Sequence, residues 1–149
     1  MRNAQLELTP LLVDSLYTEA MLLADEARAC FDRSFDAAHL SPEISVAFSC
    51  ESLKVTTRLM HSIAWLLNQK ALRAGDITES EARNETNNLG YAPASDGPLV
   101  LQFPLVTQAL IGASEELYDR LQRLSEKMRA TVPQASEPHA MRDRLRASF

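Results

Sequence analysis

The sequence predicts an all-α fold: a three-helix bundle with a short extra surface helix and a flexible C-terminal tail. Three observations favour helices over strands: the 149 residues include only four glycines, only 6% are aromatic, and apolar side chains recur at helical rather than alternating spacing. Since 46% of the residues are apolar, one domain of this length can bury a real core. We therefore expect a helical bundle domain over residues 1–130 and a disordered tail over residues 131–149.

The first long helix is expected over about residues 10–35. Thr9 can cap it, and Pro10 occupies the first helical position, where the missing amide hydrogen costs nothing. At 100° per residue, its apolar side chains fall on one stripe, namely Val13, Leu16, Tyr17, Ala20, Leu23, Ala24, Ala27 and Phe31. The opposite side is mainly acidic, so this helix should bury one face.

The second long helix is expected from the Ser41-Pro42-Glu43 start signal to Ala74, where Gly75 can adopt the left-handed conformation that ends a helix. A helical plot predicts a core face made of Leu53, Val55, Leu59, Met60, Ile63, Ala64, Leu66, Leu67 and Ala71. That face should pack on the other two long helices.

Three further segments complete the predicted fold. Thr78 and Glu81 form a capping box that should start a short surface helix from Glu79 to about Asn88. Residues 89–103 contain turn residues and should form a crossing loop. The third long helix should then run from about Pro104 to Ala130, and residues 131–149 hold too few apolar side chains to order themselves.

The predicted outer side of the second helix is the candidate site, because it carries a tryptophan amid polar residues. We interpret this side as a protein-binding or dimer interface, since Trp and Arg are enriched where binding energy concentrates. Its residues are Lys54, Arg58, His61, Trp65, Gln69 and Leu72. The alternative is that the chain's own short helix, or the loop around Tyr91, covers Trp65. In the tail, Arg142, Arg144 and Arg146 are candidate contacts to the acidic body or to a partner.

Composition excludes several classes of function. A net charge of −5 repels phosphate, so nucleic acid is an unlikely partner; the rival interpretation is a direct transcriptional or cell-cycle regulator that binds nucleic acid through Lys54, Arg58 and the tail arginines. No apolar run is long enough to span a membrane and no signal peptide is recognisable, so we expect a cytoplasmic protein. Histidines, cysteines and carboxylates occur at no metal-binding or catalytic spacing, which predicts neither an enzyme nor a metal or cofactor site.

One stretch of the second helix resembles a known family. The run FSCESLKVTTRLM over residues 48–60, followed by Ala64-Trp65-Leu66-Leu67 and Gln69, is similar to the RcdA family, the regulators of CtrA degradation in alphaproteobacteria. Looser similarity extends over residues 12–128, including Leu16-Tyr17 in the first helix and Leu117-Tyr118 in the last.

The resemblance implies a three-helix bundle, usually dimeric, that serves as an adaptor for the ClpXP protease. The adaptor is implied to join a protease already primed by a response regulator and to present protein cargo such as CtrA, with help from a cyclic-di-GMP-binding adaptor. The flexible tail is implied to matter for delivery. The family supplies no catalytic residues, in agreement with the search of this sequence.

Overall fold

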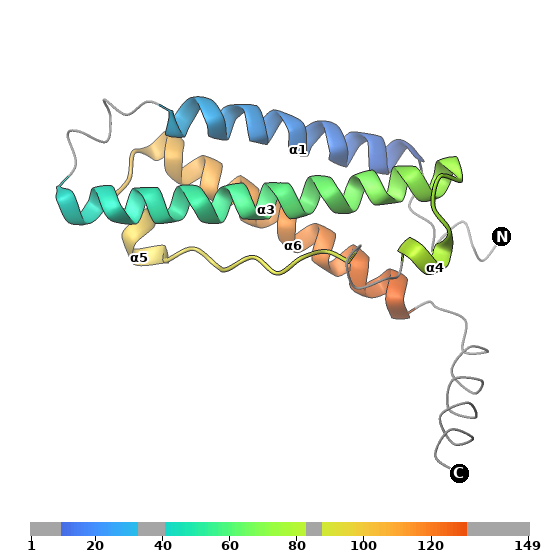
Figure 1. The fold of residues 1–149 in the computed structure, drawn as a ribbon. Helices are drawn as coiled ribbons and strands as arrows, with labels where there is room; N and C mark the ends of the chain where they lie inside the picture. The colour runs from blue at the N-terminus through green and yellow to red at the C-terminus, as the bar shows by residue number, and fades with distance from the viewer. Residues whose placement is uncertain (1–9, 33–40, 83–87, 131–149) are drawn as a thin grey trace, which may run out of the picture.

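The computed structural model describes residues 10–32, 41–82 and 88–130, and three long helices dominate it (Figure 1). They are α1 (Pro10–Phe31), α3 (Pro42–Ala74) and α6 (Leu105–Ala130), and the short helices α4 (Glu79–Ala82) and α5 (Gly97–Val100) lie between α3 and α6 in the chain. All regular elements within the described ranges are helices, and the predicted all-α bundle is confirmed. The predicted tail over residues 131–149 lies outside the described residues.

Both ends of α3 follow from local capping chemistry. At its start, the Ser41 hydroxyl accepts a hydrogen bond from the Ile44 amide at 3.3 Å, as expected of an N-cap serine followed by proline. At its end, Gly75 has a φ of 79° and its amide donates to the Leu72 carbonyl oxygen at 3.1 Å. The left-handed glycine lets the chain satisfy the last carbonyl groups and turn away, so both predicted ends are confirmed.

The shorter elements differ from the prediction in detail. The Thr78 hydroxyl accepts a hydrogen bond from the Glu81 amide at 3.1 Å, which confirms this half of the predicted capping box, and α4 follows as one turn. Its predicted continuation falls partly on residues 83–87, outside the described residues, as do Thr9 and the predicted end of the first helix. Helix α5 lies inside the predicted crossing loop, where Asp96 caps it and Pro98 occupies its first turn.

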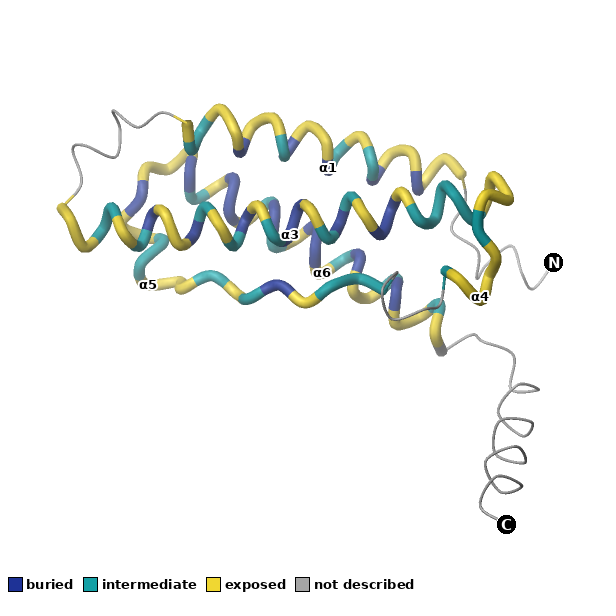
Figure 2. The backbone as a smooth tube through the Cα atoms, in the orientation of Figure 1, coloured by how far each residue is buried: buried dark blue, intermediate teal, exposed yellow. Residues whose placement is uncertain are grey.

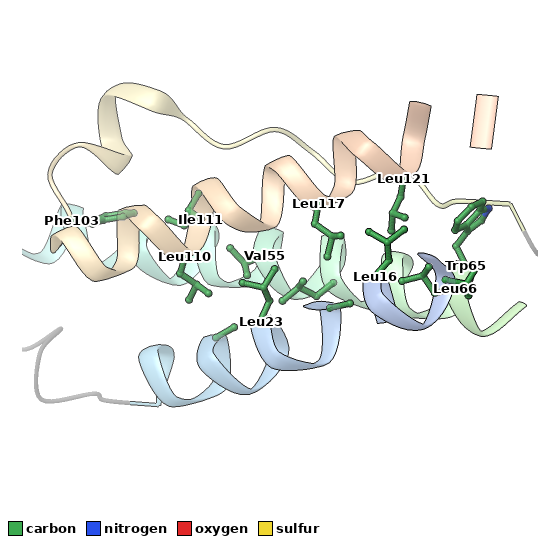
Figure 3. Close-up of a cluster of buried hydrophobic side chains, with 14 of the residues drawn as sticks. Leu16, Leu23, Val55, Trp65, Leu66, Phe103, Leu110, Ile111, Leu117 and Leu121 are labelled. Carbon is green, nitrogen blue, oxygen red and sulfur yellow. The ribbon is translucent and has the colours of Figure 1, made fainter. Parts of the chain in front are cut away.

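The core lies between the three long helices (Figures 2 and 3). The predicted stripe of α1 is confirmed, because Leu16 and Ala20 are fully buried and Tyr17 packs against the same cluster. The main buried apolar residues are Val13, Leu16, Ala20, Leu23, Ala27, Phe48, Val55, Leu59, Trp65, Leu66, Phe103, Leu110, Ile111, Leu117 and Leu121. Their layers run the length of the bundle, so α3 contacts both α1 and α6.

The predicted core face of α3 is wrong in part. Val55, Leu59 and Leu66 are buried as expected, but Leu53, Met60 and Leu67 are 69%, 63% and 46% exposed, and Ala64 is exposed too. A row containing polar residues is buried in their place, namely Phe48, Glu51, Val55, Arg58, Ser62 and Trp65. Arg58 and Glu51 can occupy that row because they form hydrogen bonds with other segments, and the Ser62 hydroxyl donates to the Arg58 carbonyl oxygen of the same helix.

Candidate functional site

A segment of extended chain, residues 89–96, leads into α5 and lies along the side of the bundle formed by α3 and α6. We call it the strap; in Figure 1 it is the yellow segment running beside α3, on the side away from α1. The Tyr118 hydroxyl of α6 donates to the Gly90 carbonyl oxygen at 2.7 Å and accepts from the Ala92 amide at 3.1 Å. Ala92 itself is buried, so the middle of the strap is part of the packed structure.

Arg58 of α3 joins the strap to α6. Its Nη2 atom donates to the Pro93 carbonyl oxygen at 2.9 Å and to Ser95 Oγ at 2.7 Å. Its Nη1 atom donates to Ser114 Oγ of α6 at 3.3 Å. The residue is only 2% exposed, so these hydrogen bonds replace the water that the guanidinium loses on burial.

Glu51 holds the other end of the strap from one side of α3. Its Oε1 atom accepts hydrogen bonds from Lys54 Nζ at 2.9 Å and from the Asp96 amide at 3.1 Å. Burial acts to raise the pKa of this carboxyl, but hydrogen bonds from Ser95, Lys54 and the Asp96 amide outweigh it and lower the pKa below its usual value. Glu51 is therefore expected to stay ionised in the folded protein near neutral pH.

The lowered pKa predicts a pH-dependent contribution of Glu51 to stability. The pKa of this carboxyl is lower in the folded state than in the unfolded state, where it is about 4.3. As the pH falls through that range, the unfolded state therefore binds more protons than the folded state. The stabilisation is present above about pH 4.3 and is lost below it. Urea unfolding between acidic and neutral pH should thus show a difference between wild type and Glu51→Gln that is largest near neutrality and shrinks on acidification.

Glu116→Gln, at an exposed position of α6, is the matched control for that measurement. A constant difference between Glu51→Gln and wild type across the whole pH range would contradict the proposed role of the ionised carboxylate.

Close packing also fixes His61 against the strap. A Cβ atom added at Gly90 would lie 2.6 Å from the imidazole Nδ1 atom, a distance shorter than any normal contact. Gly90 therefore lets the strap backbone approach α3 more closely than a residue with a side chain would allow. His61 is half-buried by this contact.

Trp65 lies in the core and not on an outer surface. It is 4% exposed and belongs to the buried cluster, where Figure 3 shows it with Leu66 at one end of the bundle. The expectation that Trp65 and Arg58 face outward is wrong, because both side chains are buried within the chain. Gln69 and Leu72 are half-buried, and Lys54 is 27% exposed and paired with Glu51.

The arrangement leaves few basic groups of α3 free to bind phosphate. Arg58 is enclosed by the strap, and Lys54 is already paired with a buried carboxylate. The nucleic-acid interpretation therefore loses both of the helix residues on which it rested. The tail residues Arg142, Arg144 and Arg146 lie outside the described residues.

The sequence prediction missed an exposed apolar row on the outward side of α3. Val46, Leu53, Met60 and Leu67 are all exposed and recur every seven residues. That interval was visible in the sequence, but Leu53, Met60 and Leu67 were assigned to the core. Beside this row, α1 and α3 border a groove of about 340 Å³ whose lining includes Ala27, Phe31, Thr56, Leu59 and Met60.

The described residues contain no group of three or more His, Cys, Asp or Glu side chains placed to hold a metal ion. None of their helices has the length and apolar character needed to cross a membrane.

Comparison with known proteins places the chain in a family. Residues 4–149 match the family described as a protein of unknown function, DUF1465. The crystal structure of RcdA from Caulobacter crescentus CB15 shares 30% sequence identity and a TM-score of 0.64, and the match covers 78% of this chain and 90% of that chain. The chain belongs to the RcdA family. No curated protein sequence matches it.

Two of the residues that hold the strap lie in the run that resembles the RcdA family. The run over residues 48–60, which carries the resemblance to the RcdA family, contains both Glu51 and Arg58. These two residues hold the strap through Asp96, Pro93 and Ser95. In this chain, the buried side of this RcdA-like run therefore holds the strap against the bundle.

Proposed function

We propose that the chain is a non-enzymatic adaptor that delivers cell-cycle regulators such as CtrA to the ClpXP protease in the cytoplasm. The observation that carries this proposal is the similarity to RcdA from Caulobacter crescentus, at 30% identity over 90% of that chain. The three-helix core and the motif over residues 48–60 support it, because they extend the similarity from sequence to architecture.

The proposed partners follow from the same family. The adaptor binds ClpXP that a response regulator has primed, receives protein cargo, and works with a cyclic-di-GMP-binding adaptor. It acts as a homodimer. Exposed apolar side chains on α1 and α3, including Leu22, Leu53 and Met60, support a protein-binding role, since such groups are characteristic of protein interfaces.

A reconstituted degradation assay tests the function. Purified ClpXP, the response regulator, the cyclic-di-GMP-binding adaptor and CtrA are combined with and without this protein, and CtrA loss is followed with time. We expect CtrA to be degraded several-fold faster when the protein is present. An unchanged rate with all components active would contradict the adaptor function.

Deletion of residues 131–149 tests the predicted role of the tail. We expect the truncated protein to lose the acceleration of CtrA degradation, because the tail is proposed to contact partners. Its thermal unfolding midpoint should stay close to that of the full chain, since the core residues found within the described ranges all lie before Ala130. Full acceleration by the truncated protein would show that delivery depends on the bundle alone.

A further inference from the structure

The side of the bundle beneath the strap is built to hold an extended main chain. Four side chains of α3 and α6 form this surface, which we call the cradle: Glu51, Arg58, His61 and Tyr118. Their hydrogen bonds go to the carbonyl oxygens of residues 90 and 93 and to the amides of residues 92 and 96. Since main-chain groups of this kind occur in almost every residue, the cradle binds the shape of an extended chain more than its side chains.

Small side chains at alternating positions let the strap approach the cradle. Successive side chains of an extended chain point to opposite faces, and Ala92 is accordingly buried whereas Tyr91 and Ala94 are exposed. Gly90, two residues before Ala92, lies so close to His61 that an added Cβ atom would require the imidazole to move. The cradle therefore fits an extended segment that has two small residues separated by one residue of any size.

The strap leaves part of the cradle's hydrogen-bonding capacity unused. Glu51 Oε2 and His61 Nδ1 are buried, and neither atom has a hydrogen-bond partner among the described residues. Buried polar atoms are nearly always paired, because an unpaired one costs free energy. An occupant with one more hydroxyl or amide group beside these two atoms would form more hydrogen bonds with the cradle than the strap does.

The strap contributes little to the core that holds the three long helices together. Its one buried residue, Ala92, is not part of the main buried cluster, and Leu89 is only partly buried against that cluster. When the strap opens, the ionised groups of Arg58 and Glu51 regain water, which offsets the hydrogen bonds that they lose. A segment with so few buried apolar contacts opens locally while the rest of the protein stays folded.

We propose that the cradle is a peptide-binding site in which an extended segment of a partner protein replaces the strap. This segment presents carbonyl oxygens to Tyr118 and Arg58 and an amide to Glu51, and it carries small side chains at the two inward positions. The strap is the built-in competitor, because its tether keeps it at an effective concentration of about millimolar. The inference goes beyond the adaptor function, since it concerns peptide binding by this chain alone.

A peptide with the strap's own sequence is the probe for the first test. A fluorescently labelled peptide of residues 88–98 is titrated into full-length Ala92→Glu, whose own strap cannot seat because it would bury a carboxylate at a 7% exposed position. Fluorescence anisotropy should show saturable binding to this variant and at least about ten-fold weaker binding to wild type, in which the tethered strap competes. The peptide that itself carries Ala92→Glu should not bind.

A second substitution tests whether the peptide lies in the cradle. Tyr118→Phe, added to the Ala92→Glu chain, removes the hydroxyl that contacts residues 90 and 92 and should weaken peptide binding about ten-fold. Asp119→Ala, at the exposed neighbouring position of α6, should leave binding unchanged. The proposal is overturned if Ala92→Glu keeps its helicity by circular dichroism and binds no peptide, or if Tyr118→Phe has no effect on binding.

Hydrogen exchange of the wild type supplies a measurement that needs no variant. The Ala92 and Asp96 amides should exchange at least about ten-fold faster than the Val55 and Leu117 amides, because only the latter pair requires the bundle itself to open. Equal rates for all four amides would mean that the strap opens only with the whole bundle, and would also overturn the proposal. Neither test contains ClpXP or CtrA, so their results and the result of the degradation assay are independent.

Discussion

Replacing Trp65 by alanine is expected to lower the free energy of unfolding by about 3–5 kcal/mol, the usual cost of deleting a large buried aromatic side chain. The indole is 4% exposed within the core cluster, so its removal leaves a cavity that the three long helices cannot fill by small shifts. For a chain of this size, the thermal midpoint should fall by about 10 °C or more. Urea and thermal unfolding followed by circular dichroism measure both quantities.

Leu101→Ala provides the matched control for Trp65→Ala. Leu101 is a large apolar residue that is 73% exposed, so its truncation should change stability by no more than about 0.5 kcal/mol. If Trp65→Ala has the same free energy of unfolding as Leu101→Ala and only its self-association changes, the indole does not stabilise the core. That result would contradict the structural role assigned to Trp65.

Replacing Arg58 by alanine should have the second large effect, a loss of at least about 3 kcal/mol, because several charge-assisted hydrogen bonds disappear together. The Pro93 carbonyl oxygen and Ser95 Oγ would lose the donor that ties the strap to α3. Hydrogen exchange should consequently speed up at the Ala92 amide, whose partner Tyr118 alone would then hold the middle of the strap. Urea unfolding and amide exchange by nuclear magnetic resonance measure the two effects.

Two further variants sharpen the Arg58 experiment. Arg58→Lys keeps the charge but lacks the planar fork that reaches two partners at once, so it should recover only part of the lost stability. Arg123→Ala, at an exposed position of α6, should be nearly neutral. Equal stability losses for Arg58→Ala and Arg123→Ala would refute the role assigned to the strap contacts.

The elements of the fold could be predicted because their ends depend on local chemistry. Ser41, Pro42 and Gly75 determine where α3 begins and ends through capping and a left-handed turn, and neither effect needs a distant residue. Helix α5 has the same kind of start signal in Asp96 and Pro98, but it is only one turn long and lies among turn residues. The sequence therefore predicted a loop at this place. Local signals were thus sufficient for every element long enough to be read.

The face of α3 could not be assigned by periodicity, because this helix has two rows with helical spacing. The row with Leu53 and Met60 is the more apolar, yet the row with Glu51 and Arg58 is buried. Burial of the polar row depends on acceptors and donors that the strap brings from 35 to 45 residues further along the chain. A helical plot contains no information about such a partner, so the candidate site was placed on the wrong side.

The strap is held almost entirely through its main chain. Apart from the Ser95 hydroxyl, the strap groups that form hydrogen bonds with Tyr118, Arg58 and Glu51 are backbone amides and carbonyl oxygens. Tyr91 and Ala94 point to solvent, and Tyr91 is 81% exposed. Relatives of this protein can therefore exchange these two side chains during evolution at little structural cost, and new binding preferences could arise at this edge while the bundle beneath stays the same.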